Sequence, residues 1–555
     1  MKAFVTGFTE EKLNEVRTHP YFAAKLEAMK KHAETLLEQE PPRFKFSQLH
    51  LFVTTGNRSE YEKVYNNYIG RLNLYSSMYL LFGEEKYIEP LADIIWNICD
   101  LETWGLPAHV AETEDLPMRR AHIELCSASV GRYFGEILAH MEDKLPELVV
   151  KRMKHEVRER IVEGYKKYDF WWKHGTSNWS AVCIAGVLAS YIYFATEEEI
   201  EAELPSMMKT MDGYLSGFDK DGCCMEGYGY WSYGFSYFCY FADLLRNYTN
   251  GKIDYFASER VENIAKFVEN CAINDKQCIR FSDCGENYRP AEFLVHFLKD
   301  VYPDLQVPSL KLGAGTDGSI RAFMWPNPRY ENSVMQPKNK IYHDAQWFIY
   351  KSNEYNFACK AGSNNEPHNH NDVGSFMISK DGKVTFTDPG VGEYTRQYFS
   401  SERYTILEPS ARSHSLPIIN GEYQVAGASE KSKIFIEREN EYSFSMENAY
   451  KIETLTSLVR HFTCEKDRIV LVDTFTLSET PSSIVERFST LVEPKIEGGK
   501  VYCGASVLEY NEAALTPVLR TETCVRSGSV KETLYLVDFE AKYPAKNMEF
   551  TFVFS

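Results

Sequence analysis

Two features that the sequence lacks limit where the protein works. No stretch is apolar over the roughly 20 residues that a membrane-spanning helix requires. The N-terminal residues MKAFVTGFTEEKLNEV also lack the apolar core and the small-residue cleavage site of a secretory signal peptide. We therefore expect a cytoplasmic protein with no membrane partner.

Positive charge is also in short supply. The chain has 61 Lys and Arg residues against 79 Asp and Glu residues, which gives a formal net charge of -18. Binding to nucleic acid requires a basic surface that neutralises phosphates, so a nucleic-acid partner is excluded. An anionic substrate would have to enter a local cleft that carries cationic groups or a metal, against the field of the whole molecule.

Paired cysteine motifs are absent. The thirteen Cys residues are scattered from Cys99 to Cys524, and no two of them form a C-x-x-C pair. An irregular set of this kind predicts mostly reduced, buried thiols.

The chain is long enough for two or three domains. It has 555 residues, of which 44% are apolar and 14% aromatic. Up to about residue 305, apolar side chains recur with the period of a helix and are interrupted by short polar loops. The predicted helices cover residues 71–100 with a break at Gly83, 121–141, 180–196, 235–249 and 291–303. This part is therefore predicted to be an array of paired helices.

From about residue 306 the pattern changes, because segments rich in Pro, Gly and Asn predict a linker. Short runs of β-branched and aromatic residues then alternate with turns, and KDGK at residues 380–383 is typical of a hairpin. We predict a multidomain α+β protein. Its helical domain is expected at residues 1–310 and an antiparallel β-sandwich at residues 311–555.

Residues 366–376, EPHNHNDVGSF, concentrate side chains that bind metals or transfer protons. If residues 368–372 are extended, side chains two positions apart point to the same side. His368, His370 and Asp372 would then share one face of a strand that continues into GSFMISK.

Asp388 is a second unusual residue. The alternation of side chains after the KDGK turn predicts that it points inward, on the same face as apolar side chains. A carboxylate there needs a charged or hydrogen-bonding partner. A metal shared with His370 and His414 would provide one, and imidazole and carboxylate ligands suit Zn²⁺, with Mn²⁺ or Fe²⁺ as alternatives. From the residues alone, a metal site, a catalytic site and a hydrogen-bonded polar cluster all stay open.

The sequence EPHNHNDVGSF, followed by TDPGVGEY and RSHS, resembles the heparinase II/III family of polysaccharide lyases. In the helical part, TSNWSAV at residues 176–182 and DGCCMEGYGYWSYGFSYF at residues 221–238 also resemble motifs of that family. The resemblance implies an N-terminal (α/α) toroid followed by a C-terminal antiparallel β-sandwich. It also implies cleavage of uronic-acid polysaccharides, such as heparan sulfate and alginate, by β-elimination.

The resemblance implies four catalytic residues. Asn178 matches the position that helps to hold the substrate carboxylate. Tyr233, with Tyr230 as the alternative, matches the catalytic Tyr of the family. His368 matches the catalytic His, which neutralises the carboxylate or acts as the base, and Tyr398 matches a Tyr that follows the aspartate.

The resemblance also implies residues that bind metal and substrate. His370, Asp388 and His414 match the ligands of a structural Zn²⁺ that braces the strand carrying the catalytic His. Substrate-binding roles fall to Tyr230, Arg403 and Glu226.

We thus predict a lyase whose partner is an anionic, uronate-containing oligosaccharide or polysaccharide. Ser177 stands where many members have Asn, and no strongly basic run marks a heparin track, which favours a short imported oligosaccharide. Two alternatives are a glycoside hydrolase on a helical toroid, with Glu226 and Asp221 as its carboxylates, and a non-catalytic glycan-binding protein. A homodimer is left open.

Overall fold

The computed structural model describes residues 7–285, 291–312 and 318–555. The chain folds into two compact units, and neither unit is one continuous segment. The first comprises Met1–Phe218, Ser232–Glu262 and Ala291–Ser333, and the second Asp219–Trp231, Asn263–Pro290 and Val334–Ser555. No helix within the described ranges is long and apolar enough to cross a membrane.

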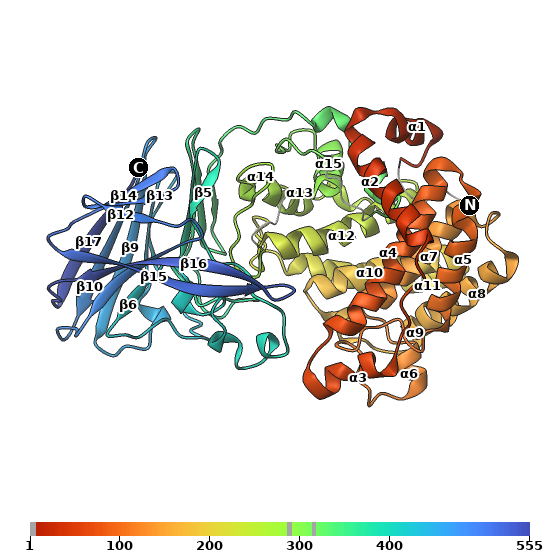
Figure 1. Cartoon of the computed structure of the whole chain (residues 1–555), viewed down its shortest axis with the longest axis horizontal. Helices are drawn as coiled ribbons and strands as arrows, with labels where there is room; N and C mark the ends of the chain where they lie inside the picture. Colours follow the sequence, from red (N-terminus) through yellow and green to blue (C-terminus); the bar gives the residue numbers. More distant parts are fainter. Residues whose placement is uncertain (1–6, 286–290, 313–317) are drawn as a thin grey trace. The chain divides into compact units, whose positions relative to one another are not determined.

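The first unit is helical (Figure 1). The predicted helices are present, and Gly83, with a φ of 68°, ends α4 where the break was expected. The helices of the chain are α1 (Glu10–Thr18), α2 (Pro20–Leu37), α3 (Phe46–Thr55), α4 (Ser59–Phe82), α5 (Ile88–Asp100), α6 (Leu116–Arg120), α7 (Leu125–Met141), α8 (Glu147–Val157), α9 (Glu163–Lys167), α10 (Asn178–Phe194), α11 (Glu197–Ser216), α12 (Tyr228–Tyr248), α13 (Glu259–Ala265), α14 (Phe267–Cys271), α15 (Glu292–Val301) and α16 (Arg321–Met324).

Helices α7 and α10 pack closely because each presents a glycine to the other. A Cβ atom on Gly186 of α10 would overlap the carbonyl oxygen of Ala128, and one on Gly131 of α7 would overlap the hydroxyl of Ser190. Residues with a side chain would therefore push the helices apart. The contact fixes the position of α10, which begins at Asn178.

Three antiparallel sheets dominate the second unit, and the predicted hairpin at residues 380–383 joins β4 to β5. The five-stranded sheet has the order β1-β2-β3-β4-β5, the eight-stranded sheet β12-β13-β14-β17-β10-β9-β8-β7, and the four-stranded sheet β15-β16-β11-β6. The strands are β1 (Lys340–Tyr342), β2 (Trp347–Lys351), β3 (Tyr355–Lys360), β4 (Phe376–Lys380), β5 (Lys383–Phe386), β6 (Pro417–Ile419), β7 (Ile434–Arg438), β8 (Glu441–Ser445), β9 (Leu455–Cys464), β10 (Ile469–Leu477), β11 (Ile484–Thr490), β12 (Lys495–Glu497), β13 (Lys500–Cys503), β14 (Ser506–Tyr510), β15 (Leu515–Arg526), β16 (Val530–Ala541) and β17 (Asn547–Phe554).

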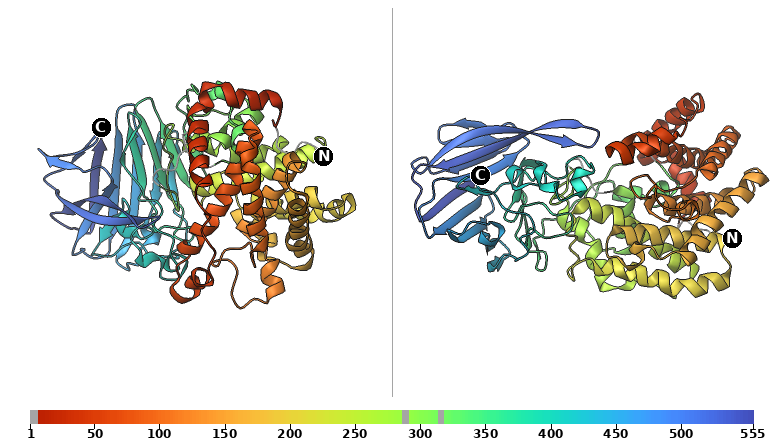
Figure 2. Two further views of the ribbon diagram at one scale, coloured as in Figure 1. Left: turned by 45° about the vertical axis from the view of Figure 1, so that its right-hand side comes forward. Right: turned by 90° about the horizontal axis from the view of Figure 1, so that it is seen from below.

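One hydrophobic core joins the three sheets. Phe376 on β4 is fully buried, and its ring centroid lies 5.4 Å from that of Phe462 on β9 and 5.6 Å from that of Phe488 on β11. A single side chain thus contacts all three sheets. Strands β15 and β16 pair along their whole length as a long ribbon (Figure 2). The predicted antiparallel fold is confirmed, and it comprises three sheets.

The thirteen cysteines are all free thiols, and twelve of them are buried. Burial raises the pKa of Cys99 to about 12, so this thiol is not reactive at neutral pH. The expectation of reduced, buried thiols is confirmed.

We expect Phe376→Ala to lower the free energy of unfolding by about 3–5 kcal/mol, because it opens a cavity where the three sheets meet. Denaturant unfolding followed by circular dichroism measures the loss. Tyr543→Ala, at a side chain that is 80% exposed in the same unit, is the control and should change the value by less than about 0.5 kcal/mol. A Phe376→Ala variant as stable as this control would contradict the shared core.

Candidate active site and metal-binding cluster

The His-rich stretch forms a loop rather than the predicted strand. Strand β4 begins only after residues 368–372, and two left-handed residues, His368 with a φ of 51° and Gly374 with a φ of 96°, interrupt any regular extension. Gln424 holds the loop, because its amide accepts from the N–H of Val373 (3.1 Å) and donates to the carbonyl of the same residue (2.6 Å). The strand prediction is wrong because these side-chain hydrogen bonds replace a sheet ladder.

His368 and His370 nevertheless converge, on a residue that no motif had indicated. The side chain of Asp283 is fully buried. Its Oδ2 accepts from His368 Nδ1 (2.8 Å), and its Oδ1 accepts from His370 Nε2 (3.0 Å). Asp372, which was expected on the same face, instead pairs with buried Lys360, whose Nζ lies 2.9 Å from Asp372 Oδ1.

Asp283 accepts two further hydrogen bonds on Oδ1, from Tyr398 Oη (2.7 Å) and from Arg403 Nη2 (2.8 Å). Burial alone would raise the pKa of Asp283, but the bonds from the two histidines and the charge of Arg403 lower it well below its usual value. The carboxylate is therefore ionised. Sequence reasoning missed it because Asp283 lies 85 positions before His368, in a segment without a recognisable motif.

The His368 imidazole is the accessible group of this cluster, with 25% of its side chain exposed. Its ring centroid lies 4.0 Å from that of Tyr230, and its Nε2 lies 3.9 Å from Glu226 Oε2. Burial raises the pKa of Glu226 above its usual value. Two predicted substrate-binding residues thus lie beside the predicted catalytic histidine.

Three tyrosines of the second unit surround this cluster. The hydroxyls of Tyr230 and Tyr394 lie 2.8 Å apart, and Tyr398 donates to Asp283. Burial raises the pKa of all three phenols. They are therefore neutral at pH 7 and better suited to donate a proton than to accept one.

Arg403 is anchored by the protein itself. Its Nε donates to the carbonyl of Asn369 (3.1 Å) and its Nη1 to the carbonyl of Tyr398 (3.3 Å). Its Nη2 donates to Asp283 and to the carbonyl of His368 (3.3 Å). The guanidinium therefore holds the loop, and its contact with substrate stays a prediction.

His370, Asp388 and His414 form a buried cluster, and one ligand atom from each lies within 4.8 Å of the other two. His414 Nε2 donates to the carbonyl of Glu408 (3.0 Å), which leaves Nδ1 to face Asp388 Oδ2 at 3.0 Å. His370 Nδ1 is buried and has no hydrogen-bond partner in the described part of the chain. Two imidazole nitrogens and one carboxylate are a donor set that fits Zn²⁺.

Asn178 and Tyr233 belong to the first unit. Asn178 is the buried first residue of α10, and a Cβ atom on Gly234 of α12 would lie 3.1 Å from Asn178 Cβ. The turn of α12 that carries Tyr233 therefore packs against the start of α10. Burial raises the pKa of Tyr233 well above its usual value. The catalytic roles of both residues stay predictions.

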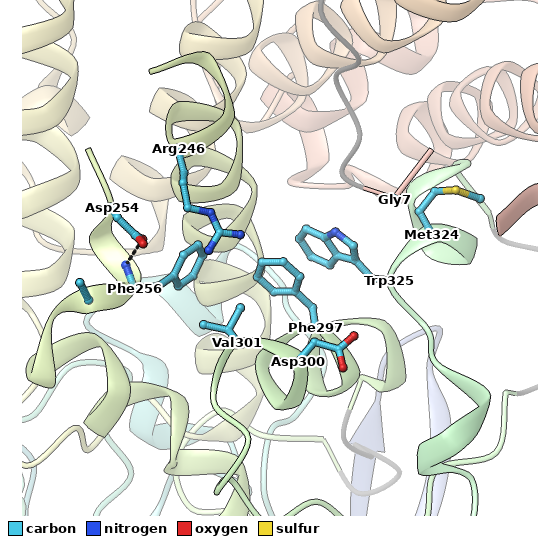
Figure 3. Close-up of a pocket in the computed structure, with 10 residues that line it drawn as sticks. Gly7, Arg246, Asp254, Phe256, Phe297, Asp300, Val301, Met324 and Trp325 are labelled. Carbon is cyan, nitrogen blue, oxygen red and sulfur yellow. Dashed lines mark hydrogen bonds between the residues drawn. The ribbon is translucent and has the colours of Figure 1, made fainter. Parts of the chain in front are cut away.

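A cavity of about 440 Å³ also lies in the first unit (Figure 3). The rings of Phe256, Phe297 and Trp325 and the guanidinium of Arg246 line it. None of the predicted site residues is part of this lining, so the size of a cavity does not locate the chemistry in this protein.

Residues 335–551 match the family model described as heparinase II/III-like, C-terminal. This part of the chain is a heparinase II/III-like domain. The predicted family is thereby confirmed, and the domain contains the buried cluster of His370, Asp388 and His414 together with His368, Tyr398 and Arg403. No curated protein sequence matches the chain.

Solved structures resemble the protein along almost the whole chain. A structure of heparinase III is 14% identical, has a TM-score of 0.64, and is matched over 92% of its own length and 100% of this chain. A mutant of the heparan sulfate lyase HepC from Pedobacter heparinus is 13% identical, has a TM-score of 0.62 and has the same coverage. The chondroitin AC lyase of Streptomyces coelicolor, in complex with chondroitin sulphate, is 8% identical with a TM-score of 0.55, and the match covers 98% of this chain and 81% of that one.

These similarities establish the fold of the chain. The predicted architecture, an (α/α) toroid followed by antiparallel β-sheets, is confirmed. Tyr230 and Glu226 lie outside residues 335–551, yet they belong to the same compact unit as the matched domain. The domain is therefore completed by residues from earlier in the chain.

We expect the purified protein to retain about one equivalent of Zn²⁺ per chain after dialysis, and His414→Ala to lose it, because a three-ligand site cannot keep the metal with two ligands. Elemental analysis by mass spectrometry measures the content. His461→Ala removes a partly exposed imidazole of β9 and should leave the content unchanged. Full metal content in His414→Ala would rule out the proposed ligand set.

Proposed function

We propose that the protein is a polysaccharide lyase that cleaves uronic-acid-containing glycans by β-elimination. The observation that carries the proposal is the accessible His368 imidazole, which bonds to Asp283 through one nitrogen and lies beside Tyr230 and Glu226. The heparinase II/III-like domain and the likeness to lyases of heparan sulfate and chondroitin support the same chemistry.

The reaction requires three kinds of group. A base takes the proton from C5 of the uronate, and the electrons of that C–H bond form the C4=C5 double bond as the C4–O4 bond breaks. An acid protonates the departing O4 oxygen. Donors that neutralise the uronate carboxylate stabilise the charge that develops when C5 loses its proton.

His368 and Tyr230 are suited to be the base and the acid. Because Asp283 Oδ2 accepts from His368 Nδ1, the neutral form of this imidazole has its lone pair on Nε2. Tyr230 keeps its proton at neutral pH and lies against the same imidazole. The hydroxyl of Tyr394, 2.8 Å away, can donate a hydrogen bond to the Tyr230 phenolate that forms, and the proton that His368 takes from C5 is returned to this phenolate through water after product release.

Neutralisation of the uronate carboxylate falls to hydrogen-bond donors rather than to a free cation. Arg403 is already paired with Asp283. Burial raises the pKa of Glu226, and its carboxyl donates a hydrogen bond to a carboxylate only when it is protonated. Asn178 and Tyr233 belong to the first unit, and the roles predicted for them are tested by substitution.

A structural Zn²⁺ held by His370, Asp388 and His414 would brace the loop on which His368 lies. Such a metal would supply rigidity to the loop. The net charge of -18 disfavours capture of a long polyanion, so we infer a short anionic oligosaccharide as the substrate.

The test is a set of incubations with oligosaccharides of heparan sulfate, hyaluronan, chondroitin, alginate and pectin. The double bond conjugated to the carboxylate absorbs in the ultraviolet, so absorbance measures the reaction. We expect one of these substrates to react, and Tyr230→Phe and His368→Ala to lower kcat by about 10²–10⁴-fold, because each removes a proton-transfer group. Tyr502→Phe, at an exposed residue of β13, is the control.

The other outcomes separate the alternatives. New reducing ends without absorbance, lost in Glu226→Gln and kept in Tyr230→Phe, would identify a glycoside hydrolase. Binding without turnover, unchanged in His368→Ala, would identify a glycan-binding protein. Absorbance that persists in Tyr230→Phe and disappears in Tyr233→Phe would assign the acid to Tyr233.

A further inference from the structure

Asp283 stands out because one buried carboxylate serves two imidazoles with different surroundings. Its Oδ2 accepts a hydrogen bond from His368, whose ring is partly exposed. Its Oδ1 accepts one from His370, whose ring is fully buried. The ring centroid of His370 lies 5.4 Å from that of His414. The carboxylate therefore stands between the accessible histidine and the metal-binding cluster.

We propose that Asp283 is a positioning residue that sets the tautomers of both histidines and couples the metal-binding cluster to the His368 imidazole. The inference rests on the proposed lyase function for what His368 does. It goes beyond that function because it assigns a role to a residue outside the matched domain, which no motif had indicated.

The tautomers follow from the acceptor character of the carboxylate. Asp283 accepts from four side chains, one of them the Arg403 guanidinium, which can only donate, so each neutral imidazole donates to this carboxylate as well. His368 then carries hydrogen on Nδ1 and presents the lone pair of Nε2 on its exposed side, 3.9 Å from Glu226. His370 carries hydrogen on Nε2 and presents the lone pair of Nδ1, the buried atom that lacks a hydrogen-bond partner among the described residues. The nitrogen without hydrogen is thus Nε2 in His368, on the exposed side of the ring, and Nδ1 in His370, which faces the proposed metal site.

Asp283 also controls the backbone of the loop. His368 has a φ of 51°, a conformation that L residues avoid unless the surroundings enforce it. Arg403 enforces it by donating to the carbonyls of His368 and Asn369, and Arg403 is held in turn by Asp283. Loss of the carboxylate would release the two imidazoles and the guanidinium together.

The coupling follows from the geometry of this chain of contacts. His370 would hold a metal through Nδ1, its buried nitrogen without a hydrogen-bond partner among the described residues, while its Nε2 bonds to Asp283 Oδ1. Because both oxygens belong to one rigid carboxylate, the position of His370 also fixes Oδ2 and the His368 ring that bonds to it. We therefore expect metal removal to loosen His368 although the metal touches no substrate.

The test compares Asp283→Asn and Asp283→Glu with the unchanged protein. Asparagine has one acceptor oxygen, so it cannot accept hydrogen bonds from His368 and His370 on two different atoms. Glutamate keeps the negative charge but displaces the carboxylate. We expect Asp283→Asn to weaken Zn²⁺ binding, measured by competition with a chromophoric chelator, by about 10- to 100-fold. We expect kcat on the substrate found above to fall by about the same factor with little change in KM, and Asp283→Glu to recover part of both.

A matched control separates positioning from folding. Asp538 on β16 is also a buried carboxylate in the second unit, and it accepts from Arg487 Nε (2.7 Å) and Arg520 Nε (2.8 Å) without contacting a histidine. Asp538→Asn should cost a similar amount of thermal stability and leave Zn²⁺ affinity and kcat unchanged. A folded Asp283→Asn protein that matches Asp538→Asn in both measurements would overturn the proposal.

A third measurement does not depend on activity. Nitrogen NMR spectra of protein labelled at histidine report which ring nitrogen carries hydrogen, and His368→Gln and His370→Gln assign the two signals. We expect His368 protonated on Nδ1 in the unchanged protein and a mixture of tautomers in Asp283→Asn. The opposite tautomer in the unchanged protein would overturn the inference, whether or not a substrate has been found.

If Asp283→Asn does not fold, Asp283→Glu decides the question. Its displaced carboxylate should lower Zn²⁺ affinity by up to about tenfold, and unchanged affinity would overturn the coupling. If no uronate glycan reacts, the proposed function fails while the metal and NMR measurements still test Asp283. If a glycan reacts and the Asp283 variants behave like the control, only the inference fails.

Discussion

The second unit depends on the compensation of one buried charge. A carboxylate removed from water is tolerated only when donors and a counter-charge replace the lost hydration, and Asp283 has four donors, one of them a guanidinium. These donors include the side chains whose direction matters most for the chemistry. The requirement to neutralise Asp283 therefore also determines the direction of His368 and His370, so one electrostatic constraint organises two sites.

Other buried charges around the loop follow the same rule. Lys360 faces Asp372, and Arg460 bonds to Asp473 while also donating to the carbonyls of Gly374 (2.7 Å) and Ser415 (2.8 Å). These cations hold loops together instead of presenting charge to a ligand. In the proposed function, an anionic glycan would therefore be recognised mainly by neutral donors, which carry a smaller desolvation cost than free cations.

Local signals in the sequence were sufficient to predict the helices and the hairpin. Non-local contacts explain why the loop and the role of Asp283 could not be predicted. Helical periodicity, Gly83 and the KDGK turn act within a few residues, so they could be predicted. The alternation of side chains at residues 366–375 predicts a strand. The segment is a loop because Gln424, 51 positions from Val373, bonds to it. Asp283 had no local signal, because its partners lie up to 120 positions away.

Because the second unit consists of separate segments of the chain, its parts are synthesised at different times. The ribosome releases the chain from its N-terminus, so Asp283 emerges before every side chain that neutralises it, and Arg403 follows 120 residues later. Until then the carboxylate must stay hydrated, and this core cannot close. A gene fragment cut at residue 335, where the matched domain begins, would encode both histidines without the acid that they share. The domain recognised by sequence is thus smaller than the unit that folds.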